Sequence, residues 1–331
     1  MNCRGGLNLS PGDAEMELTP HDSTRAAHRA FGRHRGYRAL HAKGTLLRGT
    51  FTATPQAAGL TRAAHMQGDP IEVTARVSNG AGNPRMPDYA PDVRGLAVKF
   101  YLPDGSRTDI VAQTAPQFPV RNPEGFIELI SVLGSGPRIG YELARFLTRH
   151  PAAAPKLLAN AGAMRPPPSY AACRYYAIHA FRFVDADGGW RYVRYTFVPE
   201  REEPRLWPHQ VIARGRDYLQ DEIRERLSRA PVRFILALQL AGPGDAVDDP
   251  SARWPAQREH VNAGTFEFTT LDTERETGDD VLVFDPCRVT DGIELSGDPV
   301  LRYRSAAYSD SVHDRAGVLG PRAETPEAAG A

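Results

Sequence analysis

The sequence predicts an α+β fold: a closed antiparallel eight-stranded β-barrel with inserted and flanking α-helices. Eight segments between residues 44 and 270 have the composition of β-strands, helical segments interrupt them, and two of the links are rich in turn-forming residues. An antiparallel sheet of this many strands closes into a barrel because closure removes its exposed edges.

The expected strands are rich in Val, Ile, Tyr and Phe, and they span residues 44–54, 71–79, 94–102, 108–114, 175–184, 189–198, 231–241 and 262–270. Pro103-Asp104-Gly105 links the third strand to the fourth, and Asp185–Gly189 links the fifth to the sixth. Both links are typical of hairpins because Pro, Asp and Gly favour tight turns. We expect the barrel to enclose a ligand-sized interior.

Helical periodicity predicts helices over Pro123–Leu133, Ile139–His150 and Asp217–Ser228. The third carries charges spaced for i, i+4 pairs, which is typical of a solvated outer face rather than a binding patch. Residues 24–36 carry Ala and Arg at helical spacing but also glycine, so a short helix or an irregular arm is expected there. We expect one domain over residues 21–315, with a flexible lead (1–20) before it and a disordered tail (316–331) after it.

Composition and charge narrow the classes of partner. With 40 Lys+Arg and 40 Asp+Glu in 331 residues, the formal net charge of zero gives no electrostatic basis for binding nucleic acid or an anionic membrane. Small molecules or further copies of the chain are the expected partners.

Cys3, Cys173 and Cys287 show no CxxC spacing, so neither a disulfide framework nor a zinc site is predicted. No apolar segment has the length of a signal peptide or a membrane span, so a protein of the reducing cytoplasm is expected.

His41 lies just before the first expected strand, in the run Arg38–Gly44. A lone histidine there has a simple structural explanation. Its spacing from His28 and His34 does not fit the i, i+4 pairing of a helical metal site. His41 therefore becomes a candidate for chemistry only if a second feature of the chain points to the same site.

The second feature is a helix that Asp298-Pro299 opens, since Asp caps helices and Pro suits their first position. Spacings of four and seven place Arg304, Tyr308 and Arg315 on one face. One interpretation is a surface helix with a half-buried tyrosine. The other is that Arg304 favours the phenolate of Tyr308 and lowers its pKa from about 10. A phenolate suits ferric iron, and tyrosine is an axial ligand of haem. A Cys287 thiolate is an alternative iron ligand, but nothing places that residue on the helix.

These residues, with several other segments, resemble the successive haem-site blocks of the haem catalase family, in order and in spacing. The matching blocks are Leu40–Gly44, Arg76–Ser78, Asp92–Tyr101, Asp109–Val111 and Arg304–Tyr308 with Arg315. Two further blocks, Tyr192–Glu200 and Asp249–Pro255, are more similar to the short catalase-related peroxidases. The resemblance implies a haem b between the barrel and the C-terminal helix.

On the distal side of that haem, the resemblance implies that His41 is the catalytic histidine and that Ser78 supports its other ring nitrogen. Gln113 stands where the family has an asparagine, and Phe118-Pro119 replaces a pair of phenylalanines. On the proximal side, the resemblance makes Tyr308 the iron ligand and Arg304 its hydrogen-bond partner. The other implied haem contacts are cations for the propionates or the proximal side, Arg38, Arg76 and Arg315, and an aromatic ring on the haem face, Phe126.

The implied function is a haem b-dependent peroxidase that reduces hydrogen peroxide or organic hydroperoxides with an organic electron donor. The alternatives are a catalase that disproportionates hydrogen peroxide, a hydroperoxide-rearranging enzyme similar to the allene oxide synthases, and a non-enzymatic barrel that carries haem or an apolar ligand. The family also implies a homo-oligomer, a dimer or larger.

Overall fold

The computed structural model describes residues 18–273 and 282–319, without the side chains of Pro208 and of residues 313–319. Its ten strands are β1 (Gly44–Ala53), β2 (Ile71–Asn79), β3 (Arg94–Tyr101), β4 (Arg107–Gln113), β5 (Tyr175–Tyr176), β6 (Phe181–Val184), β7 (Trp190–Pro199), β8 (Val232–Leu240), β9 (His260–Leu271) and β10 (Ile293–Leu295). The helices are α1 (Pro20–Phe31), α2 (Pro55–Ala58), α3 (Pro123–Leu133), α4 (Ile139–Arg149), α5 (Ala153–Asn160), α6 (Pro208–Ile212), α7 (Tyr218–Arg229) and α8 (Pro299–Leu319).

The strands form a closed antiparallel barrel, as expected. Hydrogen-bonded neighbours follow the order β7-β5-β4-β3-β2-β1-β9-β8, and β8 pairs back with β7 to close the ring of eight. The hairpin at Pro103–Gly105 is present, and Gly105 adopts the positive φ of 82° that a tight turn favours in glycine. Seven of the eight expected strands lie within two residues of their predicted ends.

The fifth expected strand, 175–184, is instead divided. β5 pairs with β4 and β7, whereas β6 pairs with β7 and with the unexpected β10. Residues 177–180 between them leave the ladder, and the His179 ring turns to a buried carboxylate on the chain near α8. The contact between His179 and this distant carboxylate, which no local sequence pattern predicts, therefore interrupts a segment of strong β propensity.

The barrel interior is filled by side chains. Phe51, Phe100, Phe197 and Phe266 are fully buried, and Phe266 lies with its ring centroid 4.6 Å from that of Phe51 and 5.2 Å from that of Phe197. Eight strands enclose a space that side chains of this size can occupy. The expectation of a ligand-sized interior is therefore wrong.

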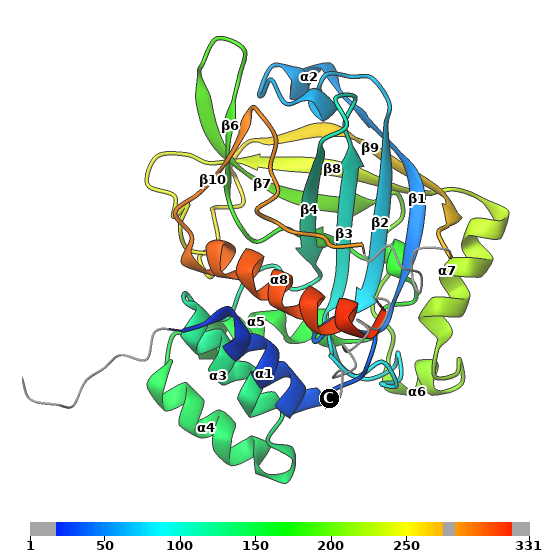
Figure 1. Ribbon diagram of the computed structural model, residues 1–331, viewed down its shortest axis with the longest axis vertical. Coiled ribbons are helices and arrows are strands. Elements are labelled where there is room, and N and C mark those ends of the chain that lie inside the picture. The colour runs from blue at the N-terminus through cyan, green and yellow to red at the C-terminus, as the bar shows by residue number, and fades with distance from the viewer. Residues whose placement is uncertain (1–17, 274–281, 320–331) are drawn as a thin grey trace, which may run out of the picture.

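Helices α1, α3, α4 and α5 gather at the lower end of the barrel, whereas α2 lies at its upper end and α7 along one side (Figure 1). α1 packs on α3, α3 packs on α4, and α8 packs on α1 and α3. In Figure 1, α8 crosses the lower ends of β1 to β4, between these strands and the α1–α3–α4 layer.

α1 is a regular helix rather than an irregular arm, because a capping box of Thr19 and Asp22 starts it. α8 continues to Leu319, past the boundary expected at residue 315. In the described ranges, no helix has the length and apolar character needed to span a bilayer.

His65 is a buried histidine in the 3₁₀ turn Ala64–Met66, with its ring 4.6 Å from that of Phe100. Within the described part of the chain, its Nδ1 has no hydrogen-bond partner. Burial lowers the pKa of His65 to about 3. The unfolded chain therefore binds a proton at this position near pH 6.5, before the folded protein does, and stability falls as the pH drops from 6.5 towards 3.

We expect His65→Leu to reduce this loss of stability on acidification by up to about 1.4 kcal/mol per pH unit. The measurement is the free energy of unfolding in denaturant between pH 7 and pH 4. Replacement of the exposed His209 by Gln serves as the control. Equal pH slopes for His65→Leu and the wild-type protein would show that the histidine is not held neutral by burial.

Candidate active site

His41 has a strained backbone just before β1. Its φ is +55°, and among the described residues it is the one non-glycine residue with a positive φ. Such a conformation persists only when surrounding contacts enforce it. The His41 N–H donates to the carbonyl oxygen of Gly80 at 2.9 Å, and Arg76 Nη1 donates to the His41 carbonyl oxygen at 2.8 Å. The buried Arg76 therefore orients the peptide that carries the imidazole.

The His41 imidazole lies against the ends of β2 and β3. Its Nδ1 is hydrogen-bonded to Ser78 Oγ at 3.0 Å, as expected for a supporting serine. A Cβ atom on Gly95 would come within 2.8 Å of both the imidazole and the serine hydroxyl, so this pair needs the glycine beneath it. The hydrogen bond at Nδ1 leaves Nε2 as the nitrogen for other chemistry.

Strand register places Gln113 beside this pair. Ser78 on β2 pairs with Gly95 on β3, and Gly95 pairs with Gln113 at the end of β4. Cross-strand partners project from the same face of a sheet, so the half-buried Gln113 faces the same side as His41 and Ser78. That side is the outer face of the barrel, because the alternate residues of these strands form the packed interior.

Burial, together with the nearby cations of Arg76, Arg304 and Arg38, lowers the pKa of His41 to about 3. The imidazole is therefore neutral near pH 7 and can accept a proton. The electrostatic effect of Arg304 indicates that this guanidinium of α8 lies near the imidazole.

A chain of hydrogen-bonded side chains joins α8 to His179, which lies between β5 and β6. Arg304 Nη2 donates to Tyr308 Oη at 2.5 Å, and Arg304 Nη1 lies 2.8 Å from His179 Nε2. His179 Nδ1 is 2.6 Å from a carboxylate oxygen of Asp298. A guanidinium only donates, so His179 Nε2 accepts and its Nδ1–H donates to Asp298. Burial lowers the pKa of His179 to about 4, which agrees with this neutral tautomer.

Sequence reasoning missed part of this chain. Asp298 was expected as a helix cap, and one of its oxygens does accept from the backbone N–H groups of Val300 and Leu301 at 2.8 and 3.2 Å. Its other oxygen holds His179, which the sequence places 119 residues earlier inside an expected strand. The break in that strand is visible only in the fold.

The remaining expected residues lie around these two sides. Arg38 donates from Nη2 to the carbonyl oxygen of Leu282 at 2.9 Å. Phe126 on α3 is half-buried, and its ring centroid lies 4.9 Å from that of Phe118. Arg315 belongs to α8, but its side chain is outside the described residues.

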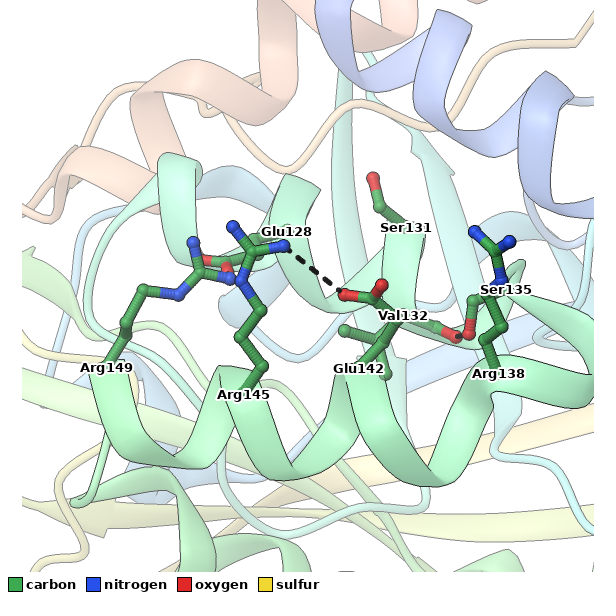
Figure 2. Close-up of a pocket in the computed structure, with 8 residues that line it drawn as sticks. All are labelled: Glu128, Ser131, Val132, Ser135, Arg138, Glu142, Arg145 and Arg149. Carbon is green, nitrogen blue, oxygen red and sulfur yellow. Dashed lines mark hydrogen bonds and ion pairs between the residues drawn. The ribbon is translucent and has the colours of Figure 1, made fainter.

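A separate groove of about 450 Å³ lies between α3 and α4, where it is lined by Glu128, Ser131, Val132, Ser135, Arg138, Glu142, Arg145 and Arg149 (Figure 2). Arg149 is paired with Glu128, and Arg145 Nη1 lies 3.8 Å from a Glu142 oxygen. None of the expected site residues lines this groove. Its charged side chains form ion pairs of the kind that is common on the surfaces of helices.

The donor set around the site fits haem. Haem requires an axial ligand, partners for two carboxylates and a face on which a substrate meets a proton acceptor. A phenol held by a guanidinium, a neutral imidazole and the nearby cations of Arg38 and Arg76 are groups of these kinds. The fold and the site together define a catalase-type protein.

Comparison with known proteins leads to the same family: residues 24–321 match the catalase family, and the chain belongs to it. It is 48% identical over 301 residues to a catalase-related peroxidase of Mycolicibacterium paratuberculosis, covering 91% of this chain and 96% of that protein. It is 35% identical to a catalase-related peroxidase of Synechococcus elongatus, covering 92% and 91% of the two chains. A catalase of Aliivibrio fischeri is 28% identical, and the match covers 85% of this chain but 62% of that protein.

Solved structures agree on the fold. Catalase A from Saccharomyces cerevisiae superimposes with a TM-score of 0.75 at 22% identity, over 84% of this chain and 61% of that one. A fungal catalase gives 0.74 at 23% identity, over 85% and 59%. The barrel with its flanking helices is therefore the catalase fold, and the chain is an oxidoreductase of this family that acts on peroxide.

Proposed function

We propose that the protein is a haem b-dependent peroxidase that reduces hydrogen peroxide or organic hydroperoxides with an organic electron donor and has little catalase activity. The observation that carries the proposal is the hydrogen-bonded chain from Asp298 through His179 and Arg304 to Tyr308, whose Arg304 lies close enough to the neutral His41 to lower its pKa. The names of the two relatives above 30% identity support the peroxidase class.

In this proposal, the side-chain oxygen of Tyr308 would hold the haem iron. Arg38, Arg76 and Arg315 provide cations for the propionates or the proximal side, and Phe126 packs on the haem face. Arg304 donates to the Tyr308 hydroxyl oxygen at 2.5 Å and so fixes the position of that oxygen. His179 and Asp298 fix the orientation of that guanidinium.

A bound haem would supply ferric iron, the redox centre needed for cleavage of the O–O bond and for the two electrons of the donor. His41 Nε2 accepts the proton of the incoming hydroperoxide and delivers it to the oxygen that leaves as water or alcohol. Ser78 keeps Nδ1 engaged during this transfer, and Arg76 keeps the peptide of His41 in place. The sum is one hydroperoxide, two electrons and two protons, giving an alcohol and water.

Gln113 is the reason that we place peroxidase activity ahead of catalase activity. Its amide lies on the same face as His41 and can donate to a bound peroxide. The extra methylene, compared with the family's asparagine, shifts that donor, and a second hydrogen peroxide must be held accurately if it is to act as the reductant.

The experiment compares oxygen release from hydrogen peroxide with oxidation of an aromatic donor by the haem-loaded protein. We expect donor oxidation with both hydrogen peroxide and an organic hydroperoxide, and slow oxygen release. Rapid oxygen release without donor oxidation would instead establish the catalase reaction. A protein that binds no haem on reconstitution would refute both.

A further inference from the structure

A buried ion pair lies on the same outer face of the barrel as the candidate site. Lys99 on β3 pairs across the sheet with Asp109 on β4, and Lys99 Nζ lies 2.5 Å from a carboxylate oxygen. Both side chains are almost fully buried, at 1% and 0% exposure. Gly95 and Gln113 of the site lie four residues further along these strands, so the pair is about 13 Å from them on the same face.

The segment 282–289 covers this pair and runs along the barrel wall. The N–H of Asp285 and the Nη1 of Arg288 each donate to the second oxygen of Asp109 at 2.8 Å. The Asp109 N–H donates to the carbonyl oxygen of Arg288 at 3.0 Å. Phe284 lies with its ring centroid 5.5 Å from Lys99 Nζ. We call residues 282–289 the strap.

The strap is also bound to α8. Ser305 Oγ donates to an oxygen of Asp285 at 2.6 Å, and Cys287 Sγ donates to the carbonyl oxygen of Leu301 at 3.2 Å. Ser305 directly follows Arg304 and lies one turn before Tyr308. α8 otherwise packs chiefly on α1 and α3. The strap therefore connects the barrel wall, which carries Ser78 and Gln113, to the helix that carries the tyrosine.

We propose that Lys99 and Asp109 are positioning residues for Tyr308: through the strap and Ser305 they set the spacing between the barrel wall and α8. This inference rests on the proposed role of Tyr308 as the haem ligand. A planar group held between two walls requires a defined separation of those walls. The carboxylate of Asp109 provides it, because one oxygen is held by the barrel while the other accepts two donors of the strap.

Fold stability alone does not explain this pair. Burying two charges is costly, and a well-packed apolar pair of similar size is often as stable. An apolar pair, however, has no acceptor for the N–H of Asp285 or for Arg288. The ion pair is thus suited to fixing the position of the strap along the barrel wall.

The experiment uses the haem-loaded full chain and two disruptions of the connection, the double variant Lys99→Met/Asp109→Leu and the single variant Ser305→Ala. The readouts are the rate of haem loss to excess apoglobin and the ferric absorption spectrum, with thermal unfolding to confirm that each variant is folded. We expect haem loss to accelerate about tenfold in both, with altered ferric bands.

Two controls separate positioning from general effects. Ser305→Thr retains the hydroxyl and is expected to match the wild-type protein. Arg233→Gln/Glu267→Gln removes an exposed cross-strand ion pair of β8 and β9 that has no contact with the strap in the hydrogen bonds described above, and it should leave haem loss unchanged. Folded disruption variants with wild-type haem loss and spectra would overturn this inference alone. Failure of the wild-type protein to bind haem would overturn the proposed function on which it rests.

Discussion

Tyr308→Phe is expected to leave a folded protein that no longer retains haem. The substitution removes the only atom of this side chain that can bind iron and leaves Arg304 Nη2 without its acceptor. Changing groups that merely support a metal ligand costs about 10–100-fold in affinity, so loss of the ligand itself should cost more. The measurement is the ratio of Soret to protein absorbance after reconstitution and removal of free haem.

Tyr303→Phe is the matched control for that substitution. Tyr303 lies on the same helix, but its hydroxyl donates to the carbonyl oxygen of Thr19 at 2.8 Å, outside the site. This variant should bind haem as the wild-type protein does. Full haem occupancy in Tyr308→Phe would refute the assignment of the ligand.

His41→Ala is expected to retain haem and to slow the reaction with peroxide by about 10²–10⁴-fold, the usual effect of losing a general acid–base group. The rate constant is measured from the change of the Soret band on rapid mixing with hydrogen peroxide. His34→Ala provides the control, because His34 Nε2 bonds the carbonyl oxygen of Phe31 rather than facing the site. Unchanged rates in His41→Ala would leave that histidine with a structural role.

The pH dependence tests the same assignment in the unmodified protein. Because burial and three arginines hold the pKa of His41 near 3, the base remains neutral as the pH falls from 7 to about 4. The rate constant should stay level over this range and decline only below it. An inflection near pH 6.5 would contradict a buried, neutral His41.

Local patterns predicted most of the barrel. Gly105 and Pro103 marked one hairpin, and β-branched and aromatic residues marked the strands on either side of it. The exception was the strand at 175–184, which breaks because His179 turns to Asp298. Propensity is a property of neighbouring residues, whereas this contact joins positions 119 residues apart.

The contacts of the candidate site were likewise predicted only in part. The spacing of four between Arg304 and Tyr308 predicted their contact, because residues one helical turn apart face each other. Ser78 was expected from the family resemblance, and its hydroxyl lies within hydrogen-bond distance of His41 Nδ1, at 3.0 Å. The role of Arg76 in holding the peptide of His41 was not expected, since a hydrogen bond from a guanidinium to a backbone carbonyl leaves no sequence pattern.

By itself, the sequence predicted most of the barrel strands and the helices α3, α4 and α7, that the strands close, and that α8 presents Arg304 and Tyr308 on one face. Each of these follows from contacts within a few residues or from the need to pair strand edges. Only the tertiary structure decided that the barrel interior is packed and that the site lies on its outer face. It also decided that His179 and the strap join α8 to the barrel, because such contacts depend on how distant segments meet in space.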